Sequence, residues 1–224
     1  MKNVISIGAI ALITWLSYES LLSLFRVKHI HVFTTNSIKF NPETFKDKVT
    51  QLGRIRFLSS LESFCSHIKQ DEWVQSCSAE RVFPDQWYLD LTYHKPIIRL
   101  IRSGKIITQS GKLVQDSAGY VTGPLPIYEG DDDHSKVAYQ LYLKANSNAK
   151  VLGVVEYVKF NESGWLIEFA RGIQVKLGEK HLLKRLELFL NLWPKHFSLK
   201  SMKQTFDMRY HNGFAYRELK HDTE

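Results

Sequence analysis

The chain has 224 residues, of which 44% are hydrophobic and 24% charged, with only 12 Gly and 6 Pro. These proportions exclude a collagen-like, low-complexity or wholly disordered chain, and the length suits one large domain or two small ones. Lys and Arg outnumber Asp and Glu by 30 to 23, giving a pI of about 9.3. This excess is compatible with a nucleic acid, an anionic membrane or an acidic partner, without choosing among them.

The amino-terminal segment is apolar. Residues 4–25 carry a single charge, Glu19, and as a helix they are long enough to cross a bilayer core of about 30 Å. No pair of small residues with the spacing of a cleavage site follows the apolar run, so we predict an uncleaved anchor behind a short tail, residues 1–3. The flanking charges, Lys2 on one side and Arg26 and Lys28 on the other, slightly favour a cytoplasmic location for the rest of the chain.

The segment up to residue 96 has the pattern of a small α+β domain. Alternating residues predict a strand at 27–33, and Asn41-Pro42 predicts the start of a helix. An apolar stripe predicts a second helix at 58–68, and two strands follow at 73–81 and 87–94 around a turn at 83–86. A three-stranded sheet with both helices on one face is the simplest packing of this order.

The remainder predicts an antiparallel sheet with packed helices. Lys95-Pro96 interrupts the strand pattern, because proline lacks an amide donor. Helices are predicted at 135–146 and at 180–193, the second ended by Pro194. Strands are predicted at 151–160, 165–170, 173–177, 205–210 and 214–219, the last two joined by a tight turn at Asn212-Gly213.

The sequence contains no catalytic signature, so we predict no enzymatic activity and no cofactor. Two Ser-x-x-Lys pairs, at Ser66 and Ser147, lack the companion motifs of penicillin-recognising enzymes. The acidic run 131–133 before His134 is interpreted as a solvated helix cap and not as a metal site. His29 and His31 share one side of a strand, where a surface or core role is favoured over metal ligation.

The two cysteines leave an alternative open. Cys65 lies on the apolar stripe of the second predicted helix, and Cys77 lies in the strand after it. Two buried thiols that act as small hydrophobic side chains are the favoured interpretation, with a disulfide in an oxidising compartment as the alternative.

Basic residues gather near the second half of the chain. A solvated helix face explains most of this group, which is Lys180, Lys184, Arg185, Lys195, Lys200 and Lys203. A nucleic-acid site would need interleaved aromatic residues on a soluble protein, so a membrane-tethered chain disfavours it.

Five motifs in order resemble the FtsQ/DivIB family of cell-division proteins. Residues 72–84, followed by Leu89-Asp90-Leu91 and Lys95-Pro96, resemble the end of a POTRA module. The other four resemble "L-P-x-x-x-G", "N-G-x-x-x-x-L-G", "K-R-L-x-x-F" and "D-L-R-Y-x-N-G-x-A", and they lie at 125–130, 171–178, 183–189 and 207–215. The resemblance covers essentially the whole chain.

The resemblance implies a domain order and a location. It implies a tail at 1–3, a transmembrane helix at 4–25, a POTRA domain at 26–96, a β domain at 97–220 and a tail at 221–224. It also implies a single-pass protein of the bacterial inner membrane, concentrated at the division septum. The C-terminal domain is then periplasmic, against the local charge count.

The implied function is a non-enzymatic scaffold of the divisome. Such proteins link early and late division proteins, hold the FtsB–FtsL pair, and help to control septal peptidoglycan synthesis; other divisome proteins are expected at the POTRA domain. The expected partner-binding residues are Arg185, Arg209, Tyr210 and Asn212, on a sheet edge that accepts a partner strand. The alternatives are a POTRA-bearing secretion or outer-membrane assembly component, and a membrane-tethered peptidoglycan enzyme.

Overall fold

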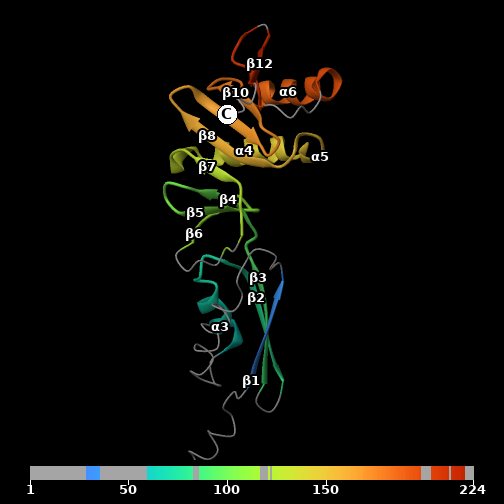
Figure 1. Cartoon of the computed structure of the whole chain (residues 1–224). Coiled ribbons are helices and arrows are strands. Elements are labelled where there is room, and N and C mark those ends of the chain that lie inside the picture. The colour runs from blue at the N-terminus through green and yellow to red at the C-terminus, as the bar shows by residue number, and fades with distance from the viewer. Residues whose placement is uncertain are drawn as a thin grey trace, which may run out of the picture. The chain divides into compact units, whose positions relative to one another are not determined.

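The computed structural model describes residues 29–35, 60–82, 86–116, 121, 123–197, 203–211 and 213–219. The chain divides into two compact units, the first ending at His94 and the second beginning at Lys95. Each unit combines a sheet with helices, which confirms the α+β class (Figure 1). Within the described ranges, no helix is long and apolar enough to cross a membrane. The predicted anchor at 4–25 lies outside those ranges.

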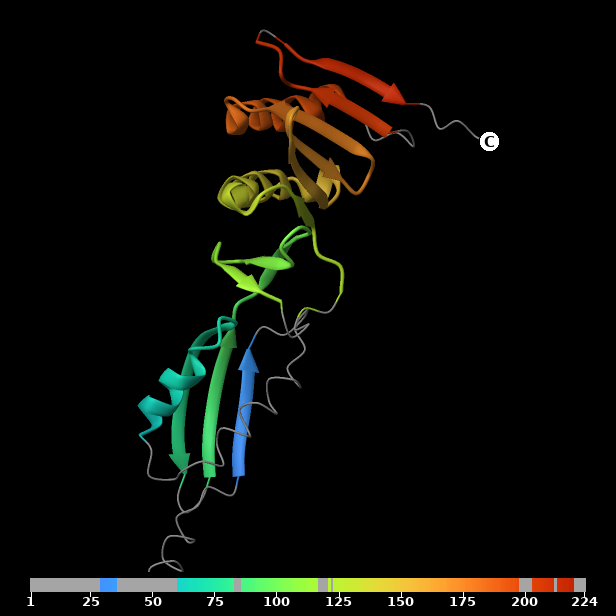
Figure 2. The same ribbon diagram turned by 90° about the vertical axis from the view of Figure 1, so that its left-hand side faces the viewer.

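The first unit contains a three-stranded sheet in the order β1-β3-β2 (Figure 2). These strands are β1 (His29–Thr35), β2 (Val74–Val82) and β3 (Gln86–Tyr93), and each lies within two residues of its predicted position. The central strand β3 is parallel to β1 and antiparallel to β2. The helix predicted from Asn41-Pro42 and most of the 83–86 turn lie outside the described residues.

Helix α3 (Leu61–Ile68) covers one face of this sheet. It begins where the Ser60 side chain accepts a hydrogen bond from the backbone N–H of Ser63 at 3.0 Å, three residues later than predicted. Phe64 meets the ring of Trp87 edge-on, with 5.1 Å between ring centroids. The same core contains the buried side chains of Ile68, Trp73, Leu89, Leu91 and Tyr93.

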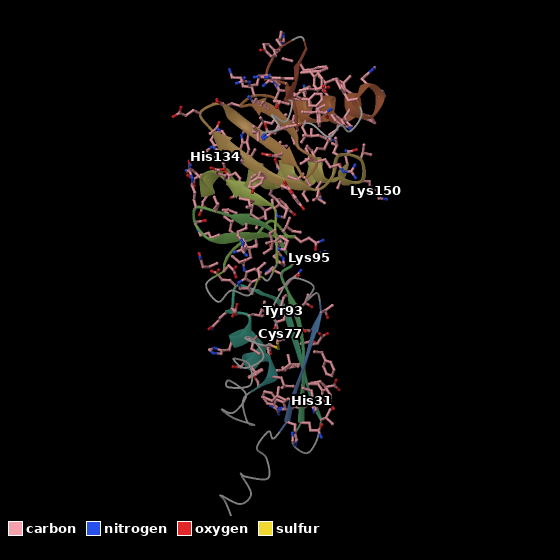
Figure 3. All side chains as sticks on the ribbon, in the orientation of Figure 1. His31, Cys77, Tyr93, Lys95, His134 and Lys150 are labelled. Atoms are coloured by element: carbon pink, nitrogen blue, oxygen red, sulfur yellow. A yellow bond between two sulfur atoms is a disulfide. The ribbon has the colours of Figure 1, made fainter. Side chains whose placement is uncertain are left out.

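A disulfide joins Cys65 of α3 to Cys77 of β2, with the two Cα atoms 5.5 Å apart (Figure 3). The favoured interpretation of two independent thiols was therefore wrong. The sequence pattern indicated the apolar stripe of the helix but not its position along the sheet. The structure places Cys65 directly against the residue of β2 whose side chain points to the same face, within the range that a disulfide can bridge.

The second unit contains a nine-stranded sheet in the order β12-β11-β10-β9-β8-β7-β4-β5-β6. The prediction of an antiparallel sheet holds for five of its eight strand pairs, but the pairs β4–β7, β7–β8 and β10–β11 are parallel, so the sheet is mixed. The strands are β4 (Pro96–Leu100), β5 (Lys105–Thr108), β6 (Leu113–Gln115), β7 (Ile127–Glu129), β8 (Val155–Asn161), β9 (Gly164–Phe169), β10 (Ile173–Gly178), β11 (Lys203–Asp207) and β12 (Ala215–Leu219).

Helical crossovers explain two of these parallel pairs, since parallel neighbours need a long connection that returns the chain to the same end of the sheet. The 3-10 helix η1 (Asp132–His134), α4 (Ser135–Asn146) and α5 (Ala149–Leu152) connect β7 to β8. Helix α6 (Leu182–His196) connects β10 to β11. The bounds of α4 match the prediction, whereas the strand predicted from residue 151 starts at Val155, after α5.

Helix α6 also corrects a prediction, because it continues through Pro194 and ends at His196. Proline removes one hydrogen bond of the helix, but the buried ring of Trp193 packs against Phe206 and Phe197 and holds this last turn in place. The main core of the unit lies between the sheet and these helices. Its largest members are Tyr128, Trp165, Phe169, Phe189, Trp193 and Phe206.

Candidate partner-binding edge

The edge strand β12 closes one end of the large sheet and has one strand neighbour, β11, within the described part of the chain. The two strands are antiparallel, with Asp207 opposite Ala215. Seven residues, 208–214, therefore connect the two strands. This connection is too long for a tight hairpin turn, so the turn predicted at 212–213 was wrong. The reason lies at Met208, whose side chain is buried and whose N–H donates to Lys176 O at 2.8 Å, so that the chain follows β10 beyond the end of β11.

A glycine contact positions the end of β10. A Cβ atom placed on Gly164 would lie 2.6 Å from the Cα of Gly178, so the two backbones can come this close only because residue 164 is glycine. Both have positive φ, +88° and +72°. Side chains of Arg185 and Arg209 pack against Gly178, where an added Cβ would lie 3.1 Å from Arg185 Nη1 and 3.2 Å from Arg209 Cγ.

Arg185 of α6 connects the ends of two strands. Its Nη1 donates to Leu177 O at 2.6 Å and its Nη2 to Arg209 O at 2.8 Å. Hydrogen bonds from a charged group to carbonyl oxygens are among the stronger ones in proteins. The contacts give Arg185 an internal role in fixing the backbone that leads to Tyr210.

Arg209 is also engaged within the chain. Its Nε and Nη2 donate to the two carboxylate oxygens of Asp207 at 2.8 and 2.6 Å, and its backbone N–H donates to Oδ1 at 3.1 Å. The Arg209 side-chain hydrogen bonds hold the pKa of Asp207 below its ordinary value, against the opposing effect of burial. Arg209 is one of the expected partner-binding residues, and Asp207 occupies two of its guanidinium donors.

Tyr210 follows this paired segment, with 59% of its side chain exposed. The structure thus brings together three of the predicted residues, Arg185, Arg209 and Tyr210, while Asn212 lies outside the described residues. A shallow pocket of about 350 Å³ adjoins the two arginines. It is also lined by Glu162, Ser163, Gly178, Glu179 and Lys180.

Aromatic side chains along the same edge escaped the sequence prediction. Tyr216 of β12 packs on Phe197 and Phe206, with ring centroids 5.2 and 4.9 Å apart, and Phe214 also contacts both of these phenylalanines. Gln204 Nε2 donates to the Tyr216 hydroxyl at 3.2 Å, and this hydroxyl also bonds to Glu218. Burial and the Glu218 carboxylate raise the pKa of Tyr216 to about 12. The alternation of Phe214, Tyr216 and Glu218 along the strand is the signal that could have indicated this face.

Other candidate residues serve local structure. Asp131 and Asp132 pair with Arg102 and Lys105 at 2.7 and 2.8 Å, and η1 and α4 have no side-chain cap, so the predicted capping role was wrong. No cluster of three or more His, Cys, Asp or Glu with metal-site geometry occurs among the described residues. Ser66 Oγ donates to Glu62 O, and Ser147 Oγ to Lys144 O, in each case within or just after its own helix.

A family model described as "Cell division protein FtsQ/DivIB, C-terminal" matches residues 99–209, which form most of the second unit. The cell division protein FtsQ of Hahella chejuensis is 29% identical over 162 residues, covering 71% of this chain and 58% of the relative. The Neisseria meningitidis serogroup B protein of the same name is 28% identical over 152 residues, covering 65% and 62%.

The FtsQ of Actinobacillus pleuropneumoniae is 23% identical over 200 residues, covering 85% of this chain and 83% of the relative. The chain matches about 60% of the length of the first two relatives. The Arg185 contacts, the glycine contact and the Asp207–Arg209 pair all lie in the segment that the family model matches. The chain belongs to the FtsQ/DivIB family of cell division proteins.

Proposed function

We propose that this chain is a non-enzymatic scaffold of the bacterial divisome that binds the FtsB–FtsL pair at the β12 edge. In this proposal, residues 4–25 anchor it in the inner membrane behind the tail 1–3, residues 26–96 form a POTRA domain, and residues 97–220 form the partner-binding β domain. The scaffold links early and late division proteins and helps to control septal peptidoglycan synthesis. Family membership supports the role in cell division.

The proposed partner site rests on one observation: an exposed aromatic residue lies in the connection that leads into the edge strand β12. An edge strand can accept a partner strand through backbone hydrogen bonds, while neighbouring side chains set register. Tyr210 is exposed, and the segment before it is fixed by Arg185 and by the Asp207–Arg209 pair. Because this segment is already fixed in the free chain, binding would lose less conformational entropy than binding to a flexible loop.

The disulfide supports the proposed location of the domains. Structural disulfides form and persist in oxidising compartments such as the periplasm, and they are rare in the cytosol. The Cys65–Cys77 bond therefore favours the orientation that family membership implies over the orientation that the charges around residues 4–25 favour.

The Tyr210→Ala variant tests the partner site. We expect an affinity loss of about thirtyfold for the FtsB–FtsL pair, equal to about 2 kcal/mol, because exposed aromatic residues dominate interfaces of this kind. Titration of the purified full chain with the FtsB–FtsL pair measures this loss. Since the ring is mostly exposed, the melting temperature should stay unchanged.

Ile101→Ala is the matched control, because Ile101 also lies in the second unit and its side chain is equally exposed, at 59%. Its affinity for the FtsB–FtsL pair should equal that of the unmodified chain. Equal affinities for the Tyr210 and Ile101 variants would remove Tyr210 from the site. A collapse in the melting temperature of the Tyr210 variant would instead assign the ring to packing.

A further inference from the structure

The sheet of the first unit has a second face, opposite α3. Side chains on this face come from alternate residues of the three strands, while Trp87 and Cys77 contact residues of α3 on the other face. No described helix lies on this second face. Its β1 members are exposed, namely His29, His31, Phe33 and Thr35.

Three rings on this face form an aromatic ladder, which we define as His31, Tyr88 and Phe33. His31 stacks on Tyr88 with 4.7 Å between centroids and 19° between planes. Phe33 lies 6.0 Å from the same ring at 8°. His31 is labelled in Figure 3. Phe33, two residues further along β1, is 56% exposed. The ladder therefore presents an aromatic surface to solvent.

Two carboxylates flank the ladder. Glu80 of β2 lies directly opposite Tyr88, and Asp90 of β3 lies directly opposite Phe33. Residues opposite each other on neighbouring strands have Cβ atoms about 5 Å apart, so each carboxylate adjoins a ring. Both side chains are exposed, and neither forms an ion pair with another described residue.

Glu80 and Asp90 set the charge of the ladder face. Of the described strand residues whose side chains alternate onto this face, these two are the only Asp, Glu, Lys or Arg residues. Arg81, the next residue along β2 after Glu80, lies over Trp87 on the opposite face, 5.4 Å from the ring centroid. The described part of the ladder face is thus acidic.

We propose that the ladder face binds a positively charged segment of a partner protein, with an Arg or Lys side chain over the rings and paired with Glu80 or Asp90. An aromatic face attracts a cation, and an adjacent carboxylate supplies a charged acceptor for its N–H groups. Apolar neighbours of that cation would contact Phe33. This site lies in the first unit and is independent of the β12 edge.

A pair of fluorescent seven-residue peptides tests this proposal, one alternating Arg and Val and the other alternating Glu and Val. Fluorescence anisotropy with the purified full chain should give saturable binding of the Arg peptide only. Phe33→Ala should weaken that binding about tenfold, and so should the double change Glu80→Gln with Asp90→Asn. Phe33→Ala removes an aromatic ring, and the double change removes two negative charges. If one of the two variants fails to fold, the other still tests the proposal.

Matched controls separate this face from general charge attraction. Glu62→Gln removes one charge from α3, on the other side of the sheet, and Val154→Ala shortens a side chain as exposed as Phe33, at 57%. Both should leave Arg-peptide affinity unchanged, and the ladder variants should keep their affinity for FtsB–FtsL.

Three results would overturn the proposal. The first is equal Arg-peptide binding by all variants, and the second is preference for the Glu peptide. The third is a dimer that Phe33→Ala converts to a monomer in sedimentation, which would assign the face to a second copy of the chain. Loss of FtsB–FtsL binding by Tyr210→Ala has no bearing on these outcomes.

Discussion

Replacing both cysteines by alanine should lower the free energy of unfolding of the first unit by about 3 kcal/mol. The bond closes a loop with a sequence separation of 12 residues, and the loss of chain entropy in the unfolded state gives a value of this size. Helix α3 is short, and the disulfide ties it to β2 in addition to the packing of Phe64 on Trp87.

Thermal unfolding with and without a thiol reductant measures this effect. The reductant should lower the melting temperature of the unmodified chain toward that of the double alanine variant, and it should not affect the variant itself. Equal stability of the two proteins under oxidising conditions would show that the bond contributes nothing and that the cysteines act as simple core side chains.

Gly164→Ala should destabilise the second unit by about 3 kcal/mol or more. The new Cβ atom would overlap the carbonyl carbon of Gly178 and lie 2.6 Å from its Cα, closer than van der Waals contact allows, and no rotation of a side chain relieves this overlap. The positive φ of +88° adds conformational strain for any residue with a Cβ.

Gly172→Ala is the matched control for the glycine contact. Gly172 also has positive φ, +76°, but the nearest atom to an added Cβ is 3.7 Å away. It should show only the conformational strain, about 1 kcal/mol. Denaturant unfolding measures the free energy of unfolding of both variants. Equal losses of stability would mean that backbone strain alone, without the contact to Gly178, accounts for the requirement for glycine at position 164.

Local patterns predicted the elements well. The apolar spacing in residues 135–146 matches α4, and the alternation after Arg171 matches β10 within one residue. Such patterns report which side of an element is buried, and that information resides in neighbouring residues.

Long-range relations could not be predicted in the same way. The parallel pairing of β10 with β11 depends on how α6 packs, and the Cys65–Cys77 bond depends on where α3 lies along the sheet. Likewise, Arg185 and Arg209 carry the right charge for an acidic partner, but the carbonyls and the carboxylate that engage them lie up to 24 residues away in sequence. Sequence alone therefore suggested residues for the proposed site but not the contacts that fix the segment before Tyr210.

Amide hydrogen exchange of the full chain, with and without the FtsB–FtsL pair, tests whether a partner strand pairs with β12. Backbone pairing with a partner strand requires slower exchange of the β12 amides (Ala215–Leu219) and of the segment around Tyr210. We expect the largest protection in the complex at these residues. Unchanged exchange in β12, with protection confined to β6 at the opposite edge of the sheet or to the first unit, would contradict it.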